Sequence, residues 1–270
     1  MTLRLGLIGF GAIGRTVALA VQEGRAGDVE LVAVMVRDAA KHEADAASFP
    51  WSFTDRPDSF FRHPMDLVVE AAGHEAVRRH AVATLLSGRD LLTLSVGAFA
   101  DDSLLSRVRE AAASSGKQVL VPSGAIGGLD AIAAAAVGGL EEVTITTRKP
   151  PRAWKGTRAE QQVELDQLTE PVCLFEGLAR QAALLYPQNV NVQAALSLAG
   201  IGMDRTRSRI YADPTVDRNT HEIVARGTFG EIRVVIGNVP SQGSAKTGLL
   251  TAMSVVKAIR HRTAPLVIGL

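Results

Sequence analysis

The chain has 270 residues, of which 47% are hydrophobic and 21% are charged. This length allows one large or two modest domains, and the composition is that of an ordinary globular protein. Lys and Arg number 29 against 28 for Asp and Glu, so no excess of charge indicates nucleic acid as a partner. One cysteine excludes an internal disulfide and a cysteine-based metal cluster. With neither a leader-like N-terminus nor an apolar run of membrane-spanning length, we expect a cytoplasmic protein with no membrane association.

The first half of the chain alternates short apolar runs with helix-like segments. Residues 3–9 form an apolar run, residues 12–22 have helical composition, and "VELVAVMVRD" is a second buried strand. The alternation continues through "MDLVVEAAG", residues 75–86, "DLLTLSVGA", residues 103–114 and "KQVLVPSGA". Continuous apolar strands separated by helices predict a doubly wound parallel sheet of the α/β class. We expect this Rossmann domain to span residues 1–128.

The pattern changes after residue 129. "EEVTITTRKP" alternates apolar and polar residues, helices are expected over residues 160–168 and 172–185, and three further strands follow in "RTRSRIYAD", "THEIVARGTF" and "EIRVVIGNV". Strands joined by turn residues predict an antiparallel meander. Residues 129–243 are therefore expected to form a second, α+β domain with a mainly antiparallel sheet. The segment 244–270 is expected to supply a helix, starting at Ser244, that packs back on the first domain.

A glycine-rich turn follows the first strand at once. Gly9, Gly11 and Gly14 fit the pattern G-x-G-x-x-G, with Ala12 and Ile13 between the last two glycines. In this pattern the first glycine permits the turn, the second lets a pyrophosphate approach the backbone, and the third lets helix and strand pack closely. The start of the helix then offers N–H groups to the phosphates. The turn therefore predicts dinucleotide binding by these five residues.

The end of the second strand bears on which nicotinamide cofactor binds. A carboxylate there binds the ribose hydroxyls of NAD, whereas an arginine accommodates the extra phosphate of NADP. The sequence "VRD" offers both, as Arg37 and Asp38. NAD is the expected cofactor, and NADP stays open. His74 ends another strand of this sheet and is a candidate for contact with cofactor or substrate, or simply for the start of a helix.

Two segments of the second half carry candidate chemistry. Removing a hydride from a carbon that bears oxygen or nitrogen requires a base for the accompanying proton, and histidine is the common choice. His221 in "DPTVDRNTHEI" begins a strand, where it is either that base or an ordinary polar residue. In "GSAKTG", Ser244 and Lys246 are candidates for binding an anionic substrate, and Ser244 equally suits a helix cap. The spacing of a metal site or of a nucleophilic serine motif is absent, so no metal is expected.

Several segments, taken together and in order, resemble the L-aspartate dehydrogenase family. They run along the whole chain: "GLIGFGAIGR", "VVEAAGHEAV", "LSVGAFAD", "VPSGAIGGLDA", "YPQNVNVQAALSLAG", "DRNTHEI" and "GSAKTGLLTAMSV". The resemblance implies NAD(P)-dependent oxidation of L-aspartate to iminoaspartate, which hydrolyses to oxaloacetate and ammonia or feeds NAD biosynthesis. It also implies the reverse reductive amination, the small molecules L-aspartate, oxaloacetate and ammonia as substrates, and assembly as a homodimer.

The resemblance also assigns residues. The family's cofactor-contacting alanine and asparagine map onto Ala125 and Asn191, with Asn189 as a neighbouring candidate on the substrate side. Its active-site histidine maps onto His221. A dicarboxylate substrate needs cations, and three are candidates by position: Lys246, Arg148 and Lys149.

Two other interpretations stay open at this point. Another two-domain Rossmann oxidoreductase, such as a homoserine dehydrogenase-like enzyme, would share the fold. A non-catalytic NAD sensor would keep the glycine turn and would have no need of the polar residues Asn191, His221 and Lys246.

Overall fold

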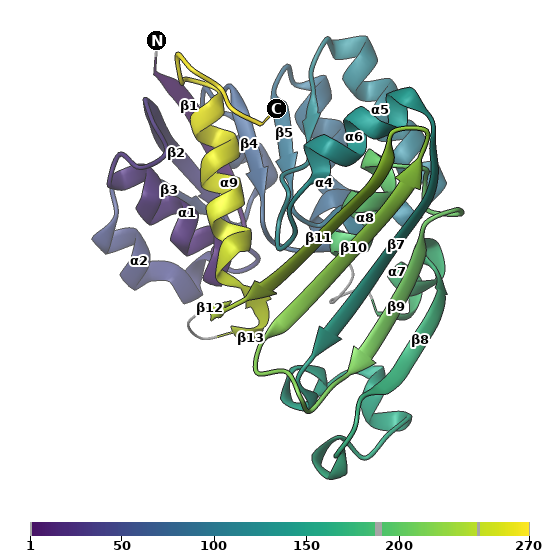
Figure 1. The fold of residues 1–270 in the computed structure, drawn as a ribbon. Helices are drawn as coiled ribbons and strands as arrows, with labels where there is room; N and C mark the ends of the chain where they lie inside the picture. Colours follow the sequence, from purple (N-terminus) through teal and green to yellow (C-terminus); the bar gives the residue numbers. More distant parts are fainter. Residues whose placement is uncertain (1, 187–190, 242–243, 270) are drawn as a thin grey trace. The chain divides into compact units, whose positions relative to one another are not determined.

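A computed structural model of the chain describes residues 2–186, 191–241 and 244–269, and at residues 240–241 and 244–247 it describes the backbone alone. The chain divides into two compact units, which Figure 1 shows in ribbon form. The first unit comprises Met1–Pro122 and Ala252–Ile268, and the second comprises Ser123–Thr251 with the last two residues. The second unit thus begins at Ser123, ahead of the expected boundary at residue 129.

The first unit is built on a six-stranded parallel sheet with the strand order β3-β2-β1-β4-β5-β6. The strands are β1 (Leu3–Ile8), β2 (Val29–Met35), β3 (Ser52–Thr54), β4 (Leu67–Glu70), β5 (Asp90–Thr93) and β6 (Val119–Leu120). This is the order of the doubly wound dinucleotide-binding fold, in which the chain reverses direction across the sheet between β1 and β4. The predicted Rossmann sheet is confirmed.

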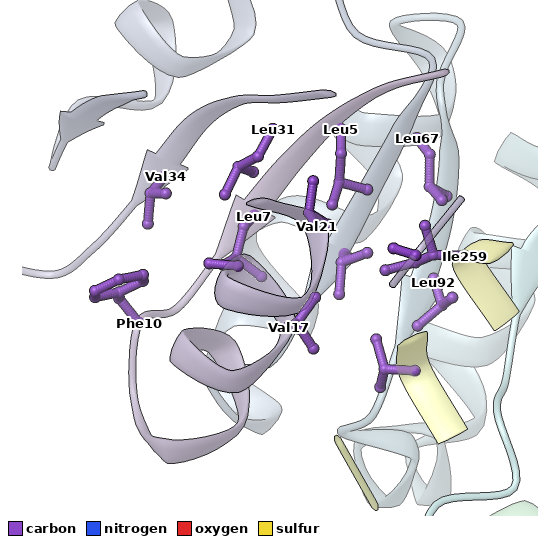
Figure 2. Packing of buried hydrophobic residues seen from close by; sticks show 14 of the residues in the cluster. Leu5, Leu7, Phe10, Val17, Val21, Leu31, Val34, Leu67, Leu92 and Ile259 are labelled. Carbon is purple, nitrogen blue, oxygen red and sulfur yellow. The ribbon is translucent and has the colours of Figure 1, made fainter. Parts of the chain in front are cut away.

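The hydrophobic core of the first unit includes residues of its first helix and of the last helix of the chain. Its helices are α1 (Ala12–Gln22), α2 (Glu43–Ser48), α3 (Pro57–Phe61), α4 (His74–Leu86), α5 (Asp102–Ser115) and α9 (Leu249–His261). Val17 of α1 and Ile259 of α9 are fully buried in one cluster with Leu5 and Leu7 of β1 (Figure 2). Burying each such side chain contributes about 1.5–3 kcal/mol. The last helix is therefore part of the first unit's core.

This last helix is shorter than predicted. Ser244–Gly248 forms strand β13, which pairs antiparallel with β12 (Pro240–Ser241), and α9 begins only at Leu249. The prediction of a helix from Ser244 is wrong because strand pairing holds this segment extended and because Gly248 is a poor residue for a helix interior.

The second unit contains a five-stranded sheet with the order β11-β10-β7-β9-β8. Its strands are β7 (Leu140–Lys149), β8 (Val172–Leu178), β9 (Arg207–Ala212), β10 (Asn219–Gly227) and β11 (Gly230–Asn238). β10 and β11 form the expected antiparallel hairpin, but β7 lies between β10 and β9 and runs parallel to β9. The predicted three-strand meander is therefore wrong in one pairing. β7 carries the fully buried residues Val143 and Ile145, as expected of a central strand.

Helices α6 (Leu129–Gly138), α7 (Ala179–Leu185) and α8 (Asn191–Ala199) lie on one face of this sheet (Figure 1). Ile132 of α6 and Leu196 of α8 pack there against β7 and β10. The helix predicted over residues 172–185 is wrong in its first half, which is strand β8, because pairing with β9 overrides a pattern that also suits a helix. The helix predicted over residues 160–168 is wrong: two short 3-10 helices, Arg158–Gln161 and Leu165–Gln167, lie there instead.

Alternation along β7 and β10 sorts their side chains between the two faces of the sheet. Val143 and Ile145 face the helices, so Thr147 and Lys149 face them too. On β10 the buried positions are Asn219, His221, Ile223 and Ala225. Four polar side chains therefore end on the covered face, at one end of the sheet: Thr147, Lys149, Asn219 and His221. No helix in the described residues is long and apolar enough to cross a membrane.

Candidate active site

The turn between β1 and α1 has the geometry that a pyrophosphate site requires. Gly9 has φ +99°, and a Cβ there would lie 2.8 Å from the Cβ of Ala72. A Cβ on Gly14 would collide with the carbonyl oxygen of Gly9, so the third glycine permits the close helix–strand contact. At Gly11, which caps α1, a Cβ would meet nothing within 4 Å. The backbone thus leaves space at the start of α1, and the residues fit NAD(P).

The cofactor-discriminating residues after β2 differ in their surroundings. The Asp38 carboxylate accepts a hydrogen bond of 3.2 Å from the Ala40 N–H and lies 3.3 Å from the Lys41 ammonium. Arg37 is exposed and makes no ion pair with the other described residues. The carboxylate is thus engaged in a local cap, while the guanidinium is available to a phosphate. This arrangement is compatible with NADP as well as NAD.

A buried carboxylate that the sequence analysis missed organises the same end of the sheet. Glu70 ends β4 and is 1% exposed. It accepts hydrogen bonds from the N–H groups of Ala72 (2.8 Å) and Gly73 (2.7 Å) and from the hydroxyls of Thr93 (2.7 Å) and Ser95 (2.9 Å). Glu70 thereby ties together the carboxyl ends of β4 and β5, where ligands of such sheets bind. The sequence did contain a signal for this residue, because Glu70 is an acidic residue inside the apolar run "LVVEAAG".

His221 stands at the centre of a buried polar cluster in the second unit. Its side chain is 4% exposed, and its Nδ1 lies 3.0 Å from the hydroxyl of Thr147, directly opposite on β7. Gln193 of α8 donates from Nε2 to the same hydroxyl over 3.2 Å. Thr147 and Gln193 were not predicted, although the alternation "VTITTRK" places Thr147 on the face of the buried Ile145.

Two physical causes keep the imidazole neutral. Burial removes the charged form from water, and the positive charge of Lys149 disfavours a second cation nearby; together they lower the pKa of His221 to about 3. At neutral pH the ring therefore carries one proton. If Nδ1 holds that proton and donates it to the Thr147 hydroxyl, then Nε2 presents a lone pair. Such a ring can accept a proton from a ligand.

Amide groups extend the cluster. Asn238 of β11 donates from Nδ2 to the carbonyl of Ala125 over 2.7 Å, and it pairs in register with Asn219, two residues before His221. Within the described part of the chain, the Oδ1 atoms of Asn219 and Asn238 and the Oε1 atom of Gln193 are buried without a hydrogen-bond partner. Buried acceptors left unpaired cost about 1–3 kcal/mol each, so bound water or a ligand is expected to supply their donors.

The predicted site residues fall into two groups. The residues of the glycine turn, Arg37 and Asp38 belong to the first unit, as does His74, the first residue of α4. Ala125, Asn191 and His221 belong to the second unit, where Asn191 begins α8 two residues before Gln193.

Three further candidates have a different outcome. Ser244 and Lys246 lie in β13, so the interpretation of Ser244 as a helix cap is wrong. Asn189 lies outside the described residues. Within the described residues no group of three or more His, Cys, Asp or Glu side chains could hold a metal ion.

A Rossmann sheet with an open glycine turn, together with a second unit that buries a neutral histidine among amides and a lysine, defines a two-domain dehydrogenase that uses NAD(P). Sequence families agree with each part. The family described as "Homoserine dehydrogenase, NAD binding domain" matches residues 9–122, and "Aspartate dehydrogenase, C-terminal" matches residues 130–262.

Relatives narrow this class further. The L-aspartate dehydrogenase of Ralstonia nicotianae is 44% identical over 265 residues, covering 96% of this chain and 97% of its own, and that of Methanocella arvoryzae is 41% identical with 98% and 99% covered. The chain therefore belongs to the L-aspartate dehydrogenase family. The crystal structure of the aspartate dehydrogenase from Thermotoga maritima is similar over 100% of both chains, with a TM-score of 0.77 and 26% identity. A homoserine dehydrogenase from Thiobacillus denitrificans shares the fold, with a TM-score of 0.63, 16% identity, and 98% and 75% of the two chains covered.

Proposed function

We propose that the protein is an L-aspartate dehydrogenase that oxidises L-aspartate to iminoaspartate with NAD(P) and catalyses the reverse reductive amination of oxaloacetate. The observation that carries the proposal is His221, buried and neutral, hydrogen-bonded to Thr147 and surrounded by amide acceptors on one face of the sheet. Membership of the family supports the choice of substrate.

In the oxidative direction, the Cα–H bond of aspartate breaks, a proton leaves the substrate nitrogen, and the C=N bond of iminoaspartate forms. The cofactor, when bound, supplies the acceptor for the hydride that leaves Cα. The residues to hold it are those of the glycine turn (Gly9, Gly11, Ala12, Ile13 and Gly14), with Arg37 and Asp38 at the adenosine ribose. Ala125 and Asn191 are proposed to contact it from the second unit.

His221 is the proposed acceptor of the proton from the substrate nitrogen. Thr147 fixes the ring through Nδ1, and Gln193 fixes Thr147 in turn. In the tautomer that carries its proton on Nδ1, Nε2 is the atom that accepts the proton. Burial and the charge of Lys149 lower the pKa of His221, so the imidazole is neutral at working pH and has a lone pair to accept a proton. The same group returns the proton in reductive amination. Substrate contacts are further proposed for His74, Asn189, Ser244 and Lys246.

The decisive test is NADH consumption, followed by absorbance, with oxaloacetate in the presence and absence of ammonium. An aspartate dehydrogenase consumes NADH only when ammonium is present, and His221→Ala is expected to lose on the order of a hundredfold in kcat, the usual scale for a general base. Consumption of NADH without ammonium would instead indicate reduction of the ketone, and no consumption at all would contradict the proposal.

We further propose that the enzyme works in the cytoplasm as a homodimer, with residues 129–243 as the substrate-binding and dimer-forming domain. The family resemblance and the composition support this. Light scattering should then give a mass near twice the 28.5 kDa of one chain. A mass equal to that of one chain would contradict the homodimer.

A further inference from the structure

Lys149 is a buried cation on the same face of the sheet as His221. It ends β7 and is 3% exposed. Its neighbour Arg148 points to the opposite face, where it pairs with Asp213 over 3.0 Å and stacks over the ring of Tyr211 at 4.4 Å. Of these two adjacent cations, only Lys149 therefore stands among the side chains of the polar cluster.

The ammonium group of Lys149 lies over the ring of a buried tryptophan. The Nζ of Lys149 lies 5.1 Å from the ring centroid of the fully buried Trp154. The indole N–H of Trp154 donates to the carbonyl of Tyr211 over 3.2 Å, and its ring meets Tyr186 edge-on at 5.8 Å. A ring face attracts a cation. The charge of Lys149 also acts at His221, where it disfavours protonation.

The orphaned amide oxygens supply the complementary half of a recognition site. Asn219 precedes His221 by two residues on the same face of β10, and Gln193 lies beside Thr147. Asn219 is 3% exposed and Gln193 is fully buried, and each has an amide oxygen without a partner among the described residues. A cation matches a carboxylate, whereas amide oxygens match the N–H donors of an amino group. An amino acid carries both groups.

We propose that Lys149 binds a carboxylate of the substrate, while the amide oxygens of Gln193 and Asn219 accept hydrogen bonds from its amino group. This inference rests on the proposed aspartate dehydrogenase function and deepens it by assigning the charged contact. Lys149, rather than Arg148, is then the cation that contacts a carboxylate of the substrate.

The direct test measures the binding of succinate, a dicarboxylate that lacks the amino group, by calorimetry with NADH present. Lys149→Met is expected to weaken binding at least tenfold, whereas Lys149→Arg retains a cation and much of the affinity. Lys155→Met is the matched control, because Lys155 is half-exposed and pairs with Asp166 at the surface. Removing one buried charge perturbs a fold when its partners stay behind, so thermal melts verify that all three variants are folded at the temperature of the binding measurement.

Binding of succinate to Lys149→Met as tightly as to the wild type would overturn the inference, and so would the absence of binding to the wild type. Kinetics then distinguish which carboxylate is held, by comparing oxaloacetate with pyruvate in ammonium. If only oxaloacetate loses kcat/KM in Lys149→Met, the side-chain carboxylate is the partner; if both lose it, the partner is the α-carboxylate. A wild type that binds succinate through Lys149 but consumes no NADH with oxaloacetate and ammonium would contradict the proposed function alone.

Discussion

Replacing Thr147 by valine removes one hydroxyl and leaves the shape of the side chain almost unchanged. That hydroxyl is the partner of His221 Nδ1 at 3.0 Å and of Gln193 Nε2 at 3.2 Å. Both partners are buried, so the substitution leaves two polar groups without a bond, at a cost of about 1–3 kcal/mol each. The free energy of unfolding should therefore fall by roughly 2–6 kcal/mol.

Activity should fall as well, because the imidazole loses the group that fixes its orientation. The loss of one such hydrogen bond, about 1.5 kcal/mol, corresponds to roughly a tenfold lower kcat. Urea denaturation and NADH decay with oxaloacetate and ammonium measure the two effects.

Thr146→Val is the matched control, since Thr146 is the preceding residue on β7 and points to the other, partly exposed face. We expect it to change stability by no more than about 0.5 kcal/mol and to leave kcat unaltered. If Thr147→Val were as active as Thr146→Val, the assignment of Thr147 as the residue that positions His221 would be refuted.

Three further predictions concern the histidine, the glycine turn and the cofactor. The pKa of His221 is near 3 in the folded protein, whereas in the unfolded chain this histidine takes up a proton as the pH falls below about 6.5. The free energy of unfolding should therefore drop by about 2 kcal/mol between pH 7 and pH 5. Urea titrations should show a smaller drop for His221→Gln. Gly11→Ala should keep the wild-type melting temperature, since a Cβ there meets nothing within 4 Å. It should nevertheless weaken NADH binding at least tenfold by calorimetry. The control Gly138→Ala, whose Cβ also meets nothing within 4 Å, should leave NADH binding unchanged. Arg37→Ala should lower the ratio of kcat/KM for NADPH over NADH by about tenfold, the value of one charge-assisted hydrogen bond; an unchanged ratio would contradict a role of Arg37 at the phosphate.

The sequence allowed the first unit to be predicted well because its signals are local. The glycine turn must follow a strand and open a helix, and each strand of the parallel sheet is a continuous apolar run. The second unit was harder to predict. Residues 172–178 carry a pattern that suits helix and strand alike, and only pairing with β9 decides for a strand.

The site shows the same division. The family resemblance, and not its position alone, singled out His221 in "DRNTHEI". Its partners come from β7 and α8, which are distant in sequence and meet it only in the folded unit. Lys149 and Arg148 were equal candidates by position. The alternation of β7 separates them, because the buried Val143 and Ile145 fix which residues face the cluster.

The central claim is that the protein interconverts L-aspartate and oxaloacetate with His221 as the proton-transfer group. The most direct measurement follows the product by NMR from oxaloacetate, ¹⁵N-labelled ammonium and NADH, with wild type and His221→Ala side by side. The wild type should form ¹⁵N-labelled L-aspartate in step with NADH oxidation, and the variant should form it on the order of a hundredfold more slowly. An unlabelled product, or equal rates for the two proteins, would contradict the account.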